Sequence, residues 1–580
     1  SLPVPTIPTA DQWSLEKSDH HHADELVSSS NSAEPTIPGS NNWAIGGELT
    51  ADGRAILASD MHLFLRVPAI WYPAVMITPA AAGGRPPAAV EENNVRLVGL
   101  TLPGTPALVA GSNGSVAWGF TNSMGDFGDL VELQPLDDDP DQYLTADGPK
   151  TIDNVTHAVH IKGQPPLTVE SQWTIWGPIT IVEPTAAGPP RRFAHHWVGH
   201  DVNATNFDLM NLEGAKFVDT AIEIANGCGM SHNNFVCADA DGQVGWTIAG
   251  QIPKRSGLPA RTPIDSSAKN IQWNGYLTPD ECPRIVRPVN HRIWTANARV
   301  VGGQALEKIG GEYVLGARAR QIRDRLLAKE QFGEHDLLEI QLDDEAILMQ
   351  RWRDLLVEVS SQTESVVSNQ FVEQVKKWNG HAAINSVGYR IIRGFRRAVI
   401  DDLDASLTAA AQLDRTNLSP FWGLQREGFV WQLVTQRPEH LLPRTDSWNE
   451  YLAAHASQVE SKLTAEVDLA LATWGQQNES AIQHPFSLAM PMLSGWLDMP
   501  AVPLPGDSCL PRVQGRSFGA SNRLVVSPGH EEDGLLHLPG GQSDHPRSPY
   551  YRRGFDDWAE GNPSPLMPGP AHHRLVLKPQ

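Results

Sequence analysis

The pair Gly39-Ser40 is the feature of this sequence that most directly allows chemistry. If the Gly39–Ser40 bond is cut, the hydroxyl of Ser40 and a new α-amino group belong to one residue. An α-amino group has a pKa of about 7.7–8.0, so near neutral pH it can accept the hydroxyl proton directly or through a water. Gly39 suits the cut, because a residue without a Cβ can adopt the strained geometry of an N-to-O acyl shift. Ser40 is therefore a candidate N-terminal nucleophile, and a plain Gly-Ser turn that leads into a strand is the alternative.

Two other segments contain residue types that bind metals or act as nucleophiles. In Asp126-Phe127-Gly128-Asp129, two carboxylates and a carbonyl between them could supply oxygen ligands to a hard cation, although a simple turn has the same composition. Gly515-Arg516-Ser517-Phe518-Gly519 fits the nucleophile elbow of α/β-hydrolases, which needs a strand before it and a helix after it. A proline-rich segment precedes this match and a strand-like segment follows it. We therefore interpret Ser517 as a residue outside the catalytic site.

The elements that must position these residues follow the order strands, helices, strands. The turn Ala51-Asp52-Gly53 predicts one hairpin, and Asp239-Ala240-Asp241-Gly242 predicts another. Helical periodicity dominates from about 314 to 475, with a capping box at Ser447-Trp448-Asn449-Glu450. Strands are expected at 43–45, 55–57, 95–102, 115–120, 234–238, 243–247 and 522–526. Regular βαβ alternation is absent, so the order predicts an α+β protein with long insertions.

Composition excludes several classes of protein. The chain has 580 residues, of which 41% are hydrophobic and 19% charged, an ordinary globular balance. Its net charge of −22 disfavours nucleic acid and anionic membranes as partners. No segment reaches the roughly 18 apolar residues of a membrane helix. The four cysteines form no CxxC pair, which excludes a zinc ribbon and a thioredoxin motif and leaves one or two disulfides open.

Residues 1–39 differ from the rest of the chain. They contain the tract His20-His21-His22 and a serine-rich run, and they lack a periodic apolar face. We interpret them as a linker or spacer, with metal binding by the histidines as the alternative. Because the chain starts with Ser1 and shows no leader segment, we expect a processed product or a fragment of a longer chain.

Several segments, taken in order, resemble the B chain of the penicillin acylase family of N-terminal-nucleophile hydrolases. The resemblance extends over roughly residues 40 to 570. The segments that carry it are Gly39-Ser40-Asn41-Asn42-Trp43-Ala44, Ser59-Asp60-Met61-His62-Leu63, Gly111 to Asn122, Asn233 to Asp239 with Gly242, Thr295-Ala296-Asn297-Ala298-Arg299, Gly540-Gly541-Gln542-Ser543, Ser548-Pro549-Tyr550-Tyr551 and Trp558.

The resemblance implies roles for five residues. Ser40 would attack an amide carbonyl with its own α-amino group as the base, and His62 would orient that amine. The oxyanion of the tetrahedral intermediate would be bound by the backbone N–H of Asn122 and the side-chain amide of Asn234. Arg255 would help to hold the amine and the substrate. Asn122 departs from the small or apolar residue that the family pattern leads us to expect, and surface positions for His62 and Arg255 are the alternatives.

The resemblance also implies a structural calcium ion bound by Asp126, the Gly128 carbonyl and Asp129. Calcium sites of this family take a further ligand from the A chain, which this sequence does not show. Residues 1–39 would be the end of the A chain plus spacer, and 40–580 the B-chain-like catalytic region with the helical block inserted. The partner would be the A chain of the same precursor, in a periplasmic or secreted heterodimer with a four-layer αββα sandwich.

The expected function is hydrolysis of a linear amide in a small N-acyl compound. Penicillins and N-acyl homoserine lactones both remain open as substrates, and Phe64, Trp71 and Tyr72 could line an apolar acyl pocket from the B-chain side. The alternative is a non-catalytic secreted binding protein that keeps the same fold and uses its tryptophan-rich loops for recognition.

Overall fold

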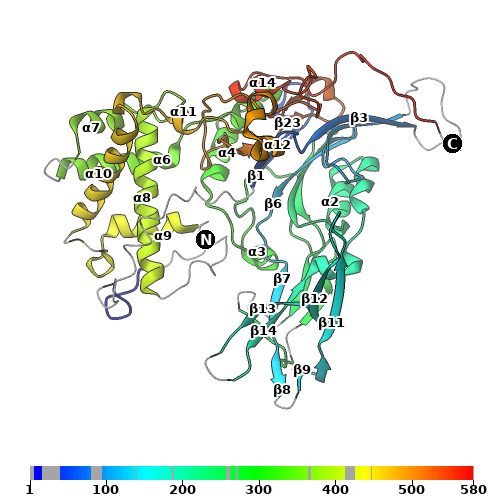
Figure 1. Ribbon diagram of the computed structural model, residues 1–580. Helices are drawn as coiled ribbons and strands as arrows, with labels where there is room; N and C mark the ends of the chain where they lie inside the picture. Colours follow the sequence, from blue (N-terminus) through cyan, green and yellow to red (C-terminus); the bar gives the residue numbers. More distant parts are fainter. Residues whose placement is uncertain are drawn as a thin grey trace.

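The computed structural model describes residues 6–578, apart from the segments 16–38, 80–93, 137–138, 186–187, 257–261, 270–271, 363–366 and 412–424 and the single residues 444 and 446. The described chain forms three regions, which we name the central sandwich, the helical lobe and the strand lobe (Figure 1). The helical lobe lies beside the sandwich, and the strand lobe extends below it (Figure 1).

Two antiparallel sheets form the central sandwich. The first sheet has the order β21 (Arg292–Thr295), β1 (Gly39–Ile45), β2 (Ile56–Phe64), β23 (Arg523–Val526) and β24 (Leu535–His537), and β22 (Phe518–Ala520) also pairs with β2. The second sheet has the order β20 (Arg284–Val286), β16 (Val244–Ala249), β15 (Asn233–Asp239), β6 (Val116–Asn122), β5 (Ala110–Ser112), β4 (Asn94–Thr101) and β3 (Tyr72–Pro79).

Side chains of β1 alternate between two cores, as the two-residue period of a strand requires. Ala44 belongs to the core between the two sheets, where it packs with Val236 of the second sheet. Trp43 and Ile45 belong to a different core on the outer face of the first sheet. By the same alternation Ser40 faces the second sheet, whereas Gly39 and Asn41 face the helices outside.

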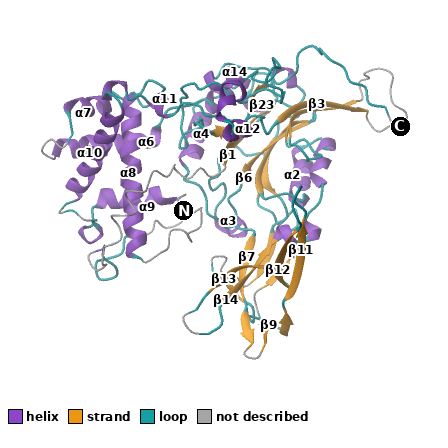
Figure 2. Ribbon diagram, viewed as in Figure 1, coloured by secondary structure: helices purple, strands orange, loops and turns teal. Residues whose placement is uncertain are grey.

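Helices cover the outer face of each sheet. Ile322 of α4 (Ala317–Leu327) and Leu337 of α5 (Glu334–Gln341) pack on the first sheet with Trp43. Ile222 of α2 (Val218–Gly227) packs on the second sheet with Phe235. The predicted α+β fold with a four-layer αββα sandwich is confirmed (Figure 2).

The helical lobe has a core of its own, which includes Trp352 and Phe395. Its helices are α6 (Ile347–Gln362), α7 (Asn369–Lys376), α8 (Val387–Ala410), α9 (Arg426–Gln436), α10 (Trp448–Glu466) and α11 (Trp474–Gln477). Ser447 caps α10 as predicted, because its side chain accepts the N–H of Glu450 at 3.2 Å. Residues 6–15 also pack here: Trp13 lies against the core, and the carbonyl of Pro8 is 2.8 Å from Nε2 of His440.

The strand lobe follows β6 in the chain, and the strands expected from the sequence do not include it as a unit. Its strands are β7 (Gly128–Glu132), β8 (Gln134–Leu136), β9 (Asp139–Thr145), β10 (Gly148–Thr151), β11 (Asp153–Val159), β12 (Leu167–Thr174), β13 (Gly177–Glu183), β14 (Arg191–Trp197) and β18 (Ile264–Asp265). A small core that includes Val131 and Tyr143 holds it together.

The remaining elements connect these regions. They are β17 (Pro253–Ser256), which pairs with β19 (Gln272–Tyr276), the helices α3 (Gly303–Ile309), α12 (Pro485–Ala489), α13 (Ser494–Leu497) and α14 (Phe555–Glu560), and the short 3-10 helices η2 (Gly47–Leu49), η3 (Val198–His200), η4 (Val202–Ala204), η5 (Asp208–Gly214), η8 (Glu439–Leu441), η9 (Leu469–Leu471), η10 (Pro491–Leu493) and η11 (Glu531–Asp533).

Both predicted hairpins are confirmed. β1 pairs with β2 in antiparallel register, and β15 pairs with β16 around a turn in which Gly242 has φ +82°. The structure joins none of the four cysteines in a disulfide. Among the described residues, no helix has the length and apolarity needed to cross a membrane. The histidine tract at 20–22 and most of the expected spacer lie outside the described residues.

Candidate active site

Ser40 lies near the start of β1 at the rim of the core between the sheets, where its side chain is buried. The backbone N–H of Asn122, the last residue of β6, lies 3.3 Å from its hydroxyl oxygen. The backbone N–H of Ser40 itself donates to Oδ1 of Asn297 at 2.8 Å. The hydroxyl and the nitrogen of Ser40 therefore both have polar partners supplied by other elements.

Asn234 lies beside Asn122 because β15 and β6 are neighbours, with Asn234 directly opposite Thr121. Its Oδ1 accepts the indole N–H of Trp246 at 3.0 Å, which leaves the amide N–H group on the side of Asn122. That group donates to the Asn122 carbonyl at 3.3 Å, a long hydrogen bond. The structure thus brings together three of the residues singled out in the sequence: Ser40, Asn122 and Asn234.

Asn297 and Arg318 complete the surroundings of the serine, and the roles assigned from the sequence include neither of them. Arg318, near the start of α4, donates to the Ser40 carbonyl at 3.0 Å and to Oδ1 of Asn297 at 2.9 Å. Asn297 Nδ2 donates to the Asn122 carbonyl at 3.0 Å. The sequence holds a signal for Asn297, which lies in a segment that carries the family resemblance. It holds none for Arg318, which sits in an arginine-rich helix typical of a surface.

His62 lies on the face of the first sheet opposite to the Ser40 hydroxyl. It is directly opposite Gly39 in the β1–β2 register, and its Nε2 is 2.6 Å from Oδ2 of Asp60. Burial is the largest influence on its pKa and lowers it, although the Asp60 hydrogen bond opposes the shift. Because a carboxylate only accepts, Nε2 carries the ring proton, and the neutral ring presents Nδ1 toward Gly39. The imidazole is therefore beside the bond expected to be cut.

Arg255 contacts the expected calcium ligands instead of Ser40. Its guanidinium donates to the Asp126 carbonyl at 2.8 Å and to Oδ2 of Asp129 at 3.0 Å, and it reaches the Gly128 carbonyl at 3.5 Å. The indole N–H of Trp273 donates to the same Asp129 oxygen at 2.6 Å. Burial raises the pKa of Asp126, and the charge of Arg255 opposes that shift.

This donor set does not fit a calcium ion while the guanidinium of Arg255 occupies it, because two cations would share the same oxygens. Among the residues that the structure describes, no three His, Cys, Asp or Glu side chains gather into a group that could hold a metal. Calcium binding by Asp126, Gly128 and Asp129 stays a prediction that requires Arg255 to move.

The three candidate residues for an acyl pocket differ in their exposure to solvent. Phe64 and Tyr72 are largely exposed, whereas Trp71 is buried and donates to the Ser521 hydroxyl at 2.8 Å. The rival nucleophile Ser517 lies in an exposed bend before β22, with neither the preceding strand nor the following helix of a nucleophile elbow.

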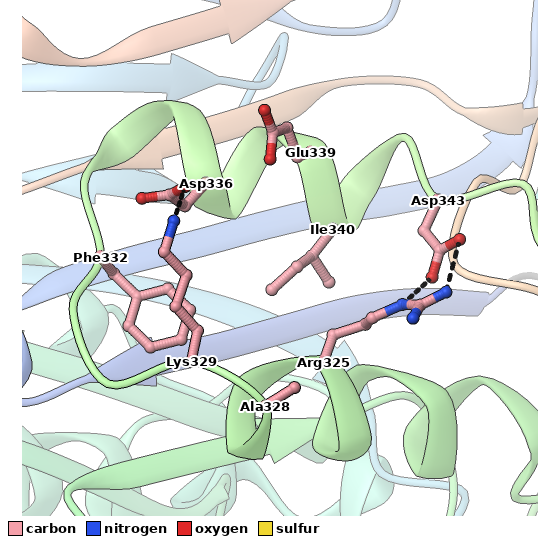
Figure 3. A pocket seen from close by; sticks show the side chains of 8 residues that line it. All are labelled: Arg325, Ala328, Lys329, Phe332, Asp336, Glu339, Ile340 and Asp343. Carbon is pink, nitrogen blue, oxygen red and sulfur yellow. Dashed lines mark hydrogen bonds and ion pairs between the residues drawn. The ribbon is translucent and has the colours of Figure 1, made fainter.

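A surface cavity of about 370 Å³ lies between α4 and α5 (Figure 3), and Ser40 is not among the residues that line it. Its lining includes two ion pairs, Arg325 with Asp343 and Lys329 with Asp336. The opposite charges of these four side chains compensate each other.

The four-layer sandwich with a serine at the start of an inner strand is the fold of the N-terminal-nucleophile hydrolases. The penicillin amidase family model matches residues 7–572, and the chain belongs to this family. A solved structure, the thermostable penicillin G acylase from Alcaligenes faecalis, superposes with a TM-score of 0.66 at 15% identity. That match covers 93% of this chain and 100% of the other.

Two relatives illustrate the family. Penicillin acylase 2 proenzyme of Pseudomonas sp. (strain SE83) is 24% identical over 550 residues, which cover 91% of this chain and 67% of that protein. Acyl-homoserine lactone acylase QuiP of Pseudomonas aeruginosa is 23% identical over 584 residues, which cover 90% of this chain and 66% of that protein. The chain thus spans about two thirds of the length of these relatives.

Proposed function

We propose that this chain is the catalytic B-chain region of an amidohydrolase that cleaves the linear amide bond of a small N-acyl compound. The observation that carries this proposal is the pair of contacts at Ser40: Asn122 N–H lies 3.3 Å from its hydroxyl, and its nitrogen is held at 2.8 Å by Asn297. A hydroxyl and a nitrogen of one residue, both held in place beside a backbone donor, are what an N-terminal nucleophile needs.

The proposed reaction starts after the Gly39–Ser40 bond has been cut. The α-amino group of Ser40 takes the hydroxyl proton as the oxygen attacks the amide carbonyl carbon. Asn122 N–H and the Asn234 amide donate to the oxyanion that forms. The amine of the substrate then takes this proton from the α-amino group and leaves, which gives an acyl ester on Ser40. A water activated by the same α-amino group hydrolyses the ester. The products are a carboxylic acid and an amine.

The substrate class, the partner and the location are part of the proposal. The names of the two relatives support either a penicillin or an N-acyl homoserine lactone as substrate. The word proenzyme in one name supports a precursor that is cut into an A chain and a B chain. The chain spans about two thirds of the length of these relatives, and in our proposal an A chain of the same precursor is its partner. We place the heterodimer in the periplasm or outside the cell.

An acyl-length scan tests the function. Wild type and Ser40→Ala, each expressed with the A chain, are assayed on penicillin G and on N-acyl homoserine lactones of increasing acyl length, and their intact masses are measured. We expect a wild-type B chain that begins at Ser40 and hydrolyses one of the two series, and a Ser40→Ala protein that stays uncut and inactive. A wild-type chain that is never cut and hydrolyses neither series would instead support a non-catalytic binding protein.

A further inference from the structure

We infer that the side chain of Asn122 is a positioning group, which fixes the turn after β6 and so directs the backbone N–H of the same residue toward Ser40. The inference rests on the proposed function, in which this N–H binds the oxyanion. It goes beyond that function, because any residue supplies a backbone N–H, whereas the turn depends on this particular side chain. The resemblance predicts a small or apolar residue at this position, which has no oxygen for such a contact.

Strand pairing does not extend past Asn122. In the register between β6 and β15, Asn122 is the last residue of its strand and lies directly opposite Asn233. Its carbonyl accepts two side-chain amides, from Asn234 at 3.3 Å and from Asn297 at 3.0 Å. The direction of the Asn122 N–H therefore depends on the backbone dihedral angles of this residue, and the chain that follows has to hold them.

The side chain of Asn122 provides that hold. Its Oδ1 accepts the backbone N–H of Met124, two residues further on, at 2.9 Å. This contact closes an Asx turn, which restricts the dihedral angles of Asn122 and of Ser123 between the two partners. The orientation of the amide is determined as well, since a flipped amide would point its NH₂ group at another N–H.

The turn contains a residue in an unfavourable conformation. Met124 is buried and has a left-handed backbone (φ +54°), which a residue with a long apolar side chain rarely adopts. The turn is also packed tightly, because a Cβ on Gly311 would lie only 2.0 Å from the Met124 carbonyl oxygen. Ser123 secures it further by donating to the His232 carbonyl at 2.8 Å. Loss of the Asn122 contact would leave this conformation with less support.

A relaxed turn would act on the chemical step more than on binding. The Asn122 N–H lies 3.3 Å from the Ser40 hydroxyl oxygen. A backbone donor stabilises the oxyanion only when it points at the position that the negative oxygen takes. The substrate carbonyl carries much less charge before the attack, so a misdirected N–H should weaken the transition state more than the bound substrate. A change in this side chain should therefore appear in kcat.

The test separates the oxygen of the side chain from the rest of it. Asn122→Ala removes the acceptor, and Asn122→Ser keeps a hydroxyl that can accept the N–H two residues on. Asn379→Ala is the matched control, because Oδ1 of Asn379 accepts the N–H of His381 at 3.3 Å in a turn of the helical lobe. Each protein is expressed with the A chain. We measure its intact mass, melting temperature, kcat and KM, and hydrogen–deuterium exchange in peptides that contain Met124.

We expect kcat to fall by about tenfold in Asn122→Ala with KM little changed, because a donor is misdirected but not removed. In Asn122→Ser, kcat should stay within about threefold of wild type, and Asn379→Ala should match wild type. Exchange at Met124 should be faster in Asn122→Ala alone. If Asn122→Ala is folded but uncut while the other two are cut, the inference is supported as well, since the same N–H faces the Ser40 hydroxyl in the uncut chain.

Three results would overturn the inference: equal losses of kcat in Asn122→Ala and Asn122→Ser, a raised KM with unchanged kcat, which would mean a direct contact with the substrate, or unchanged exchange at Met124 in Asn122→Ala. If Asn122→Ala does not fold, Asn122→Ser decides alone, and a loss of kcat beyond about threefold counts against the inference. A wild-type protein that is neither cut nor active would instead overturn the proposed function, whereas exchange at Met124 would still report on the turn.

Discussion

The backbone N–H of Asn122 lies 3.3 Å from the hydroxyl of Ser40, so the last residue of β6 meets the second residue of β1. The two strands belong to different sheets, and only the face-to-face packing of the sandwich brings them together.

Asn234→Ala is expected to lower kcat by about 10²–10³-fold with a small change in KM, because one donor to the oxyanion is lost. Steady-state kinetics on the best substrate of the acyl-length scan would measure this. Asn233→Ala is the matched control, since the Asn233 amide donates to the carbonyl and the hydroxyl of Ser231, two residues earlier in the chain. Equal losses of kcat in both variants would contradict the role of Asn234.

Gly39→Val is expected to slow the cut without changing the enzyme that results. A Cβ on Gly39 would lie 3.0 Å from Oδ1 of Asn297 and 3.6 Å from Nδ1 of His62, so two further methyl groups would displace both. In the proposed reaction the B chain begins after this residue, so it would be identical in both proteins. Intact mass against time after synthesis would show the delay, and kcat/KM per cut molecule should equal wild type. Cleavage at the normal rate would show that this crowding is harmless.

Arg255→Gln is expected to lower the free energy of unfolding by about 3 kcal/mol, because the carboxylates of Asp126 and Asp129 lose the one cation that they share. The freed oxygens of Asp126, Gly128 and Asp129 should then accept calcium. Thermal melting with and without millimolar Ca²⁺ should show a rise in melting temperature for the variant, no rise for wild type, and a smaller effect of Mg²⁺. A rise of equal size in wild type would show that calcium binds beside Arg255.

Acid should destabilise the protein partly through His537. Burial, with a further contribution from Arg523, lowers the pKa of this histidine to about 3. Below about pH 6.5 the unfolded chain binds a proton that the native protein excludes until about pH 3. The contribution of His537 to the free energy of unfolding is therefore fully present above pH 6.5. It falls with acidification, by at most about 1.4 kcal/mol per pH unit.

Denaturant unfolding of wild type and His537→Gln between pH 4.5 and 7 would measure this slope, which should be shallower in the variant. The variant also loses the 2.7 Å hydrogen bond between His537 and the Asn562 carbonyl. That loss lowers the free energy of unfolding equally at each pH, so it does not change the slope. His157→Gln, at an exposed position on β11, is the control and should keep the wild-type slope. If His537→Gln keeps it as well, the histidine is not the source of the acid sensitivity.

The parts of the fold that local chemistry determines could be predicted from the sequence. The β15–β16 hairpin forms around Gly242, whose positive φ marks the turn, and α10 begins where Ser447 accepts the Glu450 N–H. The strand lobe could not be predicted as a unit, because its strands are partly exposed on both faces and have no clear alternation of apolar residues.

The residues of the candidate site could likewise be predicted only in part. The Gly39-Ser40 pair is local and could be recognised, and the family resemblance pointed to Asn122 and Asn234. Arg318 lies 278 residues from Ser40, and its helix, with four arginines among eleven residues, is typical of a solvated surface. Only the packing of α4 on the first sheet turns this arginine inward. Arg255 lies against Asp126 and Asp129, and its expected role beside the amine stays a prediction.

The docking of residues 6–15 on the helical lobe has a mechanical consequence. This segment is attached there by Trp13 and by the contact between Pro8 and His440, far along the chain from Gly39. Breaking one peptide bond after Gly39 would change the number of polypeptides without releasing a fragment, so size-exclusion chromatography under native conditions should show one particle and denaturing electrophoresis two bands.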